Sequence, residues 1–160
     1  GVYIKQKGDK PLDNNVKWEF GEKVFVEEYI ACQELGCAVM GDKALGVIEL
    51  RPKEGFYDYV AKYTCGKTDH LMPAPIPKEI YNDIMAYSLK AHEALECTGI
   101  TRSDFRYDPK KNKVYLLELN TQPGFTPLSL VPEIAAHVGL TFDMLIAWLI
   151  EDGLCQGLRQ

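Results

Sequence analysis

Two carboxylates and one carboxamide lie in adjacent stretches that are predicted to be strands. Asp104 belongs to ITRSDFRY, and Glu118 and Asn120 belong to VYLLELN, which follows after a turn at DPKKN. Side chains alternate between the faces of a strand, so Glu118 and Asn120 share a face. The odd-numbered positions are apolar and are expected to be buried; they are Phe105, Tyr107, Tyr115, Leu117 and Leu119. A hairpin should therefore pair position 104 with 118 and position 102 with 120, which gathers the polar groups on the other face.

This pattern suits a divalent metal site. Two neighbouring carboxylates repel each other unless a cation lies between them. Carboxylate and amide oxygens are hard ligands that suit Mg²⁺ or Mn²⁺, which keep coordination positions open for water and substrate phosphates. Glu118 could then bridge two ions, one shared with Asp104 and one shared with Asn120. A solvated polar sheet face is the alternative that the spacing alone leaves open.

The surrounding segments predict an α+β fold with a mainly antiparallel sheet. KVFVEEYI at 23–30 is rich in β-branched and aromatic residues, which is typical of a strand. ELGCAVMG and ALGVIEL are separated by the turn-forming Gly41-Asp42-Lys43, which predicts two antiparallel strands. The segment 51–77 has little periodicity and predicts a long loop of the kind that covers binding sites, either disordered or displaced relative to the helices.

Three helices are predicted. Apolar residues recur at three- and four-residue intervals after Pro77, which predicts a helix up to about Cys97. Its expected apolar face consists of Ile80, Ile84, Tyr87, Ala91 and Leu95. Shorter helices are expected from Ser129 to Val138 and from Thr141, as N-cap, to about Asp152. Strands, a helix, a hairpin and then helices are typical of an α+β domain.

Composition argues against several classes of protein. The chain of 160 residues has a net charge of -5 and no cluster of Lys or Arg, so nucleic acid is not an expected partner. No apolar run reaches the roughly 18 residues that span a bilayer. The five cysteines form no CxxC pair, which predicts reduced thiols and a cytoplasmic location. The opening residues GVYIKQ lack an initiator Met, which suggests a chain that begins partway through a larger protein.

RSDF and YLLELNTQPGFTPLSLVP resemble the metal- and substrate-binding segment of the D-alanine–D-alanine ligases, which are ATP-grasp enzymes. VEEYI, FYDYVAKY and CGKTDHLMPAPI match further segments in the same order, so the resemblance covers nearly the whole chain. It implies an ATP-grasp C-terminal domain at 31–160, preceded at 1–30 by the tail of the central ATP lid domain. It also implies an enzyme of peptidoglycan synthesis that uses ATP to join two D-alanines through an acyl-phosphate.

The resemblance assigns residues to the ligation step. The metal ligands would be Asp104, Glu118 and Asn120, which would hold two Mg²⁺ or Mn²⁺ ions against the ATP phosphates. Arg102 would stabilise the charge on the acyl-phosphate and the tetrahedral species. The backbone N–H of Gly124 would bind the developing oxyanion. Ser129 and Leu130, at a helix start, would receive the carboxylate of the second D-alanine.

The resemblance also assigns ATP contacts. Glu27 would accept a hydrogen bond from the adenine amino group, and the main chain of Glu28 and Ile30 would complete the adenine site. Glu28 replaces a residue that is often basic in the family, but only its main chain is needed. Glu34 would contact the ribose or tether the lid.

In the loop 51–77, Lys62 would reach phosphate and Tyr63 would help to close the site. The family also has an N-terminal half that supplies further phosphate-binding groups, and the full-length protein is expected to be a homodimer. The isolated chain is therefore expected to be inactive. Two alternatives remain open: another ATP-grasp carboxylate-amine ligase, and a nucleotide-binding module that does not turn over.

Overall fold

The computed structural model describes residues 4–5, 8–10, 21, 23–30, 32–52, 68–126 and 129–157. The chain divides into two units, Gly1–Ala31 and Cys32–Gln160. The strand predicted at 23–30 is wrong, because these residues belong to no strand and Phe25 and Val26 are 88% and 83% exposed. A strand needs a neighbour for its backbone hydrogen bonds, and the described part of the first unit contains no other strand.

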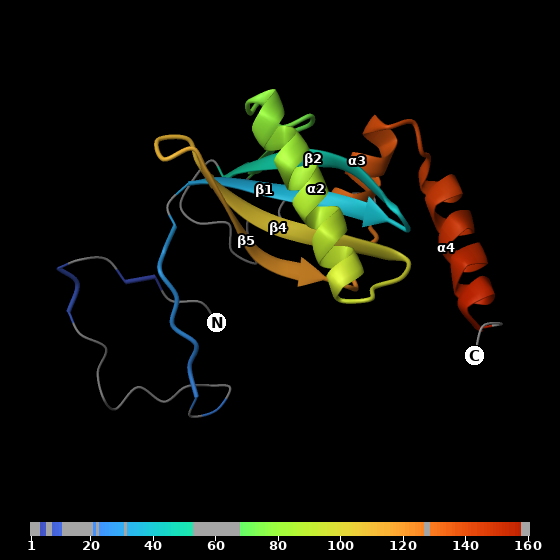
Figure 1. Cartoon of the computed structure of the whole chain (residues 1–160), viewed down its shortest axis with the longest axis horizontal. Helices are drawn as coiled ribbons and strands as arrows, with labels where there is room; N and C mark the ends of the chain where they lie inside the picture. Colours follow the sequence, from blue (N-terminus) through green and yellow to red (C-terminus); the bar gives the residue numbers. More distant parts are fainter. Residues whose placement is uncertain are drawn as a thin grey trace. The chain divides into compact units, whose positions relative to one another are not determined.

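In the second unit, five strands form one sheet in the order β3-β2-β1-β4-β5 (Figure 1). The strands are β1 (Gln33–Met40), β2 (Lys43–Pro52), β3 (Thr68–Leu71), β4 (Ile100–Asp108) and β5 (Lys113–Asn120). All neighbours are antiparallel, which confirms the predicted sheet. The prediction of a displaced loop over 51–77 is wrong at β3, which pairs with β2. Residues 53–67 lie outside the described residues.

Three helices accompany the sheet, at positions close to those predicted. They are α2 (Lys78–Ala94), α3 (Leu130–His137) and α4 (Phe142–Gly157). Pro77 is the N-cap of α2, and Thr141 caps α4 by accepting a 3.2 Å hydrogen bond from the Met144 N–H. The C-terminal helix therefore starts where predicted but runs past Asp152. Gly139 ends α3 with a φ of 87°, a conformation that glycine adopts without a Cβ clash.

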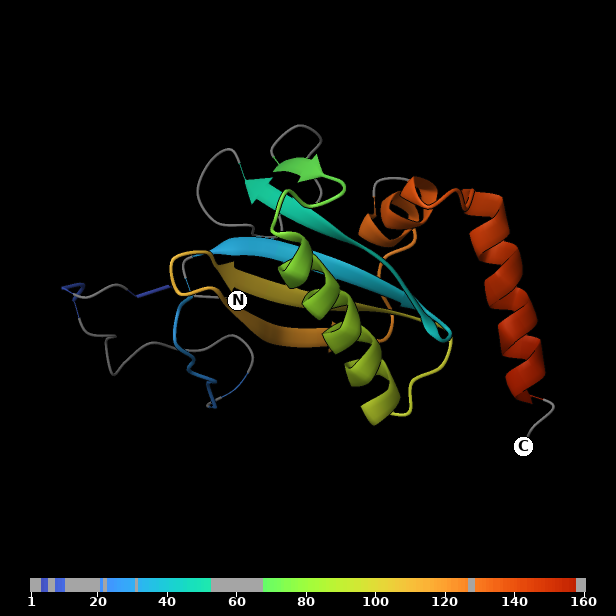
Figure 2. The ribbon, with the colours of Figure 1, turned by 45° about the horizontal axis from the view of Figure 1, so that its top comes forward.

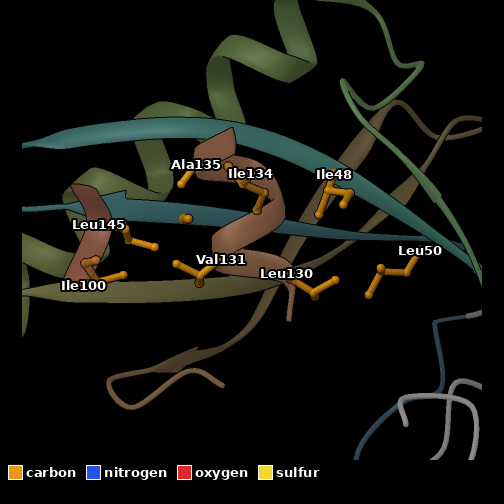
Figure 3. Close-up of a cluster of buried hydrophobic side chains, with 9 residues drawn as sticks. Ile48, Leu50, Ile100, Leu130, Val131, Ile134, Ala135 and Leu145 are labelled. Carbon is orange, nitrogen blue, oxygen red and sulfur yellow. The ribbon is translucent and has the colours of Figure 1, made fainter. Parts of the chain in front are cut away.

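The sheet is covered on both faces, as the alternation of its strands requires. Figure 2 shows α2 crossing one face, where it covers odd-numbered strand residues such as Leu35, Val47 and Phe105. Figure 3 shows α3 directing Val131 and Ile134 towards the even-numbered side chains of the other face. The two clusters lie on opposite faces, so the face that carries Asp104 is the face that α3 covers.

The buried stripe of α2 differs from the predicted one. Ile80 and Ile84 are buried as expected, but the next buried positions are Ser88 and His92. Tyr87 is 49% exposed and Leu95 is 63% exposed. The buried residues thus recur at every fourth position. Ser88 and His92 can occupy two of these positions because polar side chains can be buried when they are hydrogen-bonded. Two bonds satisfy them, one from Ser88 to the Ile84 carbonyl at 2.8 Å and one between His92 and Thr101 at 2.8 Å.

The last helix packs by one side only. Leu145 is fully buried, while Ile150 and Leu154 are 59% and 65% exposed. Trp148 lies against the β1–β2 turn, where a Cβ on Gly41 would come within 3.1 Å of its ring. Among the described residues no single helix is long and apolar enough to cross a bilayer, and α3 with α4 reaches that length only across a 107° bend.

Candidate metal and substrate site

The β4–β5 hairpin has the predicted register at the polar residues. Asp104 pairs with Glu118, and Arg102 pairs with Asn120. Residues directly opposite each other in an antiparallel pair share a face. The four side chains therefore lie on one face of the sheet, as the alternation of polar and apolar residues predicts. Glu118 is exposed, while Asp104 and Asn120 are half-buried, so the ligands lie between core and solvent.

A β-bulge follows this pair and changes the rest of β5. The register shifts between Asp104 and Phe105, so Phe105 pairs with Leu116 and Leu117 has no partner on β4. Beyond the bulge Tyr115 pairs with Arg106, which places Tyr115 on the ligand face. The prediction that Tyr115 and Leu117 are buried with the odd-numbered residues is therefore wrong. Leu117 is 49% exposed. Bulges re-aim side chains next to functional sites.

Arg102 forms a two-pronged ion pair with Asp104. Its Nε lies 2.7 Å from Asp104 Oδ1 and its Nη2 lies 2.8 Å from Oδ2. The two side chains are only 12% and 18% exposed. A planar guanidinium matches a carboxylate in this geometry, and such charge-assisted bonds are stronger than neutral ones. Asp104 is therefore already oriented and already faces a positive charge.

Gly36 makes room for this ion pair. Gly36 pairs with Asp104 across β1 and β4. A Cβ at Gly36 would lie 3.8 Å from both Arg102 Cδ and Asp104 Oδ1, and 3.4 Å from Ile48. A side chain longer than Ala would therefore displace the pair. Sequence reasoning missed this residue, although a glycine within a strand signals the close approach of another group.

Glu34 lies on the same face as the ligands and forms an ion pair with another strand residue. Arg106 Nη2 lies 2.7 Å from Glu34 Oε2, and Arg106 Nη1 donates a 2.9 Å hydrogen bond to the Cys32 carbonyl. This cross-strand pair ties the start of β1 to β4. A ribose contact by Glu34 would compete with the pair, and the role assigned to Glu34 stays a prediction.

After β5 the chain turns towards α3 through Gly124. Asn120 Oδ1 accepts a 2.9 Å hydrogen bond from the Gln122 N–H, which fixes its carboxamide. The Ser129 hydroxyl accepts a 2.9 Å bond from the Thr126 N–H. A Cβ at Gly124 would lie 3.0 Å from that hydroxyl, so only glycine fits without a shift. This turn holds the predicted oxyanion donor beside the N-cap of α3.

The start of α3 offers free backbone donors. Ser129 is its N-cap without a side-chain cap bond, so the first turn keeps N–H groups for another acceptor. Leu130 is 6% exposed and its side chain belongs to the core, so only its main chain could meet a ligand. Pro132 has no N–H, which leaves Leu130 and Val131 as the donors of the first turn.

The structure does not place the remaining predicted residues relative to this face. Glu27, Glu28 and Ile30 lie in the first unit, outside any strand. Lys62 and Tyr63 lie outside the described residues. The adenine and phosphate contacts therefore stay predictions.

The donor set fits a hard divalent cation. Asp104, Glu118 and Asn120 offer carboxylate and amide oxygens on one face, which are the ligands that Mg²⁺ and Mn²⁺ prefer. Within 32–52, 68–126, 129–157 and the described residues of the first unit, no three His, Cys, Asp or Glu side chains form a metal-binding group. The proposed set contains only two such side chains, and Asn120 is the third ligand. Two protein carboxylates suffice where substrate phosphates complete the coordination.

Two of the described thiols of the second unit have a raised pKa. Cys32, Cys37, Cys97 and Cys155 are free. Burial raises the pKa of the Cys37 thiol to about 11, although hydrogen bonds with Ser88 and the Gly46 backbone oppose the shift. The pKa of Cys32 is also raised, first by burial and then by Asp108. Both therefore stay protonated near neutral pH.

The fold resembles the ATP-grasp ligases. The D-alanine–D-alanine ligase of Bacillus anthracis in complex with ATP superimposes with a TM-score of 0.67 at 28% identity, covering 80% of this chain and 40% of that one. The VanG D-Ala:D-Ser ligase of Enterococcus faecalis gives a TM-score of 0.65 at 35% identity, covering 78% and 37%. A mainly antiparallel sheet with flanking helices and this ligand face defines the C-terminal domain of an ATP-grasp enzyme.

Sequence relatives specify the family. The model described as D-ala D-ala ligase C-terminus matches residues 9–151, and the chain belongs to this family. D-alanine–D-alanine ligase B of Mesorhizobium japonicum is 52% identical over 97% of this chain and 53% of its own length. The D-alanine–D-alanine ligase of Chelativorans sp. is 48% identical over the same shares. The chain thus spans about half the length of the curated relatives it matches.

Proposed function

We propose that this chain is the C-terminal half of an ATP-dependent ligase that joins two D-alanines. The observation that carries the proposal is the register that sets Glu118 opposite Asp104 and Asn120 opposite Arg102 on one face. The names of the curated relatives support the reaction, and the ATP complex of the Bacillus anthracis ligase supports the nucleotide. The first unit would be the tail of the central lid domain.

In this proposal the chemistry runs through an acyl-phosphate. A carboxylate oxygen of the first D-alanine attacks the γ-phosphorus of ATP, and ADP leaves. The amine of the second D-alanine then attacks the acyl carbon, loses a proton, and phosphate leaves as the peptide bond forms. Divalent cations held by Asp104, Glu118 and Asn120 would neutralise phosphate charge.

The other groups of the site orient the reactants and stabilise charge. Arg102 would stabilise the charge that develops on the acyl-phosphate and the tetrahedral species, and the Gly124 N–H would bind the oxyanion. The first turn of α3, at Ser129 and Leu130, would hold the carboxylate of the second D-alanine, because free N–H groups and the helix dipole favour an anion. Positioning of this kind supplies much of the effect without a covalent protein nucleophile.

Several further assignments belong to the same proposal. Glu27, Glu28 and Ile30 would contact adenine, and Lys62 and Tyr63 would close over the phosphates. Glu34 would reach the ribose once Arg106 releases it. A cytoplasmic location and a homodimer of the complete ligase also stay predictions.

The test is a complete ligase made by joining this chain to the N-terminal half of the Mesorhizobium japonicum relative. We expect dipeptide and phosphate from D-alanine with ATP and Mg²⁺, and neither from L-alanine or without metal. The isolated chain should release no phosphate, because phosphoryl transfer needs the groups of the other half. A fusion that binds ATP but makes no dipeptide would overturn the proposal in favour of a non-catalytic module.

Glu118→Gln should abolish dipeptide formation in that fusion while the fold is retained, because Glu118 is exposed and not part of the core. Glu151→Gln is the matched control, since Glu151 is an exposed carboxylate on α4. Adding D-serine as the second substrate tests whether the enzyme is a ligase of another specificity. Formation of D-alanyl-D-serine in preference to D-alanyl-D-alanine would overturn the D-alanine assignment.

A further inference from the structure

His70 on β3 contacts Glu133 on α3. The two atoms, His70 Nδ1 and Glu133 Oε2, are 2.6 Å apart, and the side chains are 25% and 35% exposed. The residues are 63 positions apart in the chain. This contact joins an edge strand to the helix that would hold the second substrate, and the roles proposed above do not use it.

The strand that carries His70 is short. β3 has four residues and pairs with β2 alone, from Glu49 opposite Leu71 to Pro52 opposite Thr68. His70 lies opposite Leu50, whose side chain belongs to the cluster under α3, so His70 is on the face that α3 covers. A short edge strand gains few backbone hydrogen bonds. A side-chain tie to α3 therefore affects where β3 lies.

Glu133 is in the first turn of α3. Its N–H donates a 3.3 Å bond to the Ser129 carbonyl, the residue that caps the helix. Glu133 thus lies in the same turn as Leu130 and Val131, whose N–H groups have no helix acceptor. Because Pro132 supplies no N–H, this turn has few donors, and a small rotation of α3 would misdirect both of them.

We propose that the His70–Glu133 pair positions the first turn of α3 for the carboxylate of the second D-alanine, which rests on the function proposed above. The pair also fixes the strand that follows residues 53–67, where Lys62 and Tyr63 lie. His70 and Glu133 are positioning residues: they orient backbone donors and contact no substrate. The pair acts on binding of the second amino acid and not on the metal site, which lies on β4 and β5.

The test compares Glu133→Gln, His70→Gln and the double variant in the fusion ligase. Each single variant should raise the KM for the second D-alanine about three- to tenfold, the range that a partly exposed hydrogen-bonded contact can supply. The kcat and the KM for ATP should stay within about twofold, since phosphoryl transfer uses other residues. The double variant should show no further loss, because either change alone breaks the same contact.

Matched controls separate positioning from general stability. His137→Gln changes an exposed histidine at the other end of α3, and Glu151→Gln changes an exposed carboxylate on α4. Neither should alter the KM for D-alanine. In the 160-residue chain, Glu133→Gln should speed hydrogen exchange at β3 and at the N–H of residue 133, which is bonded to the Ser129 carbonyl, with α2 unchanged.

The outcomes distinguish this inference from the proposed function. Activity of the unaltered fusion with D-alanine judges the function. If that activity is present, an unchanged KM in both single variants overturns the positioning role, and so do additive effects in the double variant. A lower melting temperature with unchanged KM would show that the pair is structural only, which also overturns it.

Discussion

Arg102 and Asp104 are joined by two hydrogen bonds, at 2.7 and 2.8 Å, on the face where Glu118 and Asn120 lie. The guanidinium uses one lone pair on each carboxylate oxygen, and its charge opposes a second cation beside Asp104. The residue proposed to stabilise the reaction thus also competes for a proposed metal ligand. Metal affinity and catalysis should therefore respond to Arg102 in opposite directions.

Arg102→Met should bind Mn²⁺ about three- to tenfold more tightly than the unaltered chain, because a competing cation is removed. The same change should abolish ligation in the fusion ligase. Titration of the 160-residue chain with Mn²⁺, followed by electron paramagnetic resonance, measures the first effect. Arg106→Met removes the same charge from the same strand and controls for net charge, and Asp104→Asn should weaken Mn²⁺ binding. Weaker or equal binding in Arg102→Met would contradict the competition.

Gly124→Ala should destabilise the chain by up to about 1 kcal/mol, the low end of the overpacking range, because Gly124 is exposed. Its Cβ would come within 3.0 Å of the Ser129 hydroxyl, which Thr126 holds by two hydrogen bonds. In the fusion ligase the KM for the second D-alanine should rise as the N-cap of α3 moves. Urea unfolding and substrate titration check the two effects.

Gly153→Ala is the opposite case and the control. Gly153 lies within α4, and no atom lies within 4 Å of a Cβ built there. Alanine should stabilise the chain by about 0.5–1 kcal/mol, because glycine is a poor helix former. Equal effects of the two substitutions on unfolding would show that the contact with Ser129 carries no strain.

Tyr81→Phe should cost about 1–3 kcal/mol of unfolding free energy. The Tyr81 hydroxyl accepts a 2.9 Å bond from the Val47 N–H, and the Val47 carbonyl accepts a 2.8 Å bond from the Ala74 N–H. These bonds satisfy the backbone N–H and carbonyl of Val47, which lies beyond the residues of β2 that pair with β3. Phenylalanine would leave a buried donor unsatisfied. Tyr87→Phe, at a half-exposed position on the same helix, should change stability by less than about 0.5 kcal/mol; urea unfolding compares them.

Stability should fall above pH 9 because of Cys37. The pKa of its thiol is raised by burial from an ordinary value of 9.0 to about 11. Between these values the unfolded chain loses the proton first, so unfolding is favoured as pH rises. The expected loss is roughly 2–3 kcal/mol. Urea unfolding from pH 8 to 11 should show a shallower decline for Cys37→Ala than for the unaltered chain or for Cys155→Ala, and three parallel curves would refute this.

The sequence by itself determined the elements whose signals are local. The turn residues Gly41-Asp42-Lys43 between two apolar segments indicated β1 and β2. Alternation of polar and apolar residues indicated β4 and β5, and the register of this hairpin at Asp104 and Glu118 followed from which faces could be buried. Thr141 marked the start of α4, because its side-chain hydroxyl can accept a hydrogen bond from a backbone N–H of the first turn. The resemblance to the ligases could also be recognised from the sequence, because short contiguous segments carry the family motifs.

Only the tertiary structure decided the features that depend on distant partners. β3 exists because β2 offers it an edge, whereas 23–30 forms no strand without a described neighbour in its unit. The bulge at Leu117 moves Tyr115 to the ligand face, because one unpaired residue reverses all side chains beyond it. The contacts of Asp104 with Arg102 and of Glu133 with His70 likewise follow from packing, since alternation fixes which face a residue occupies but not which side chain it meets there.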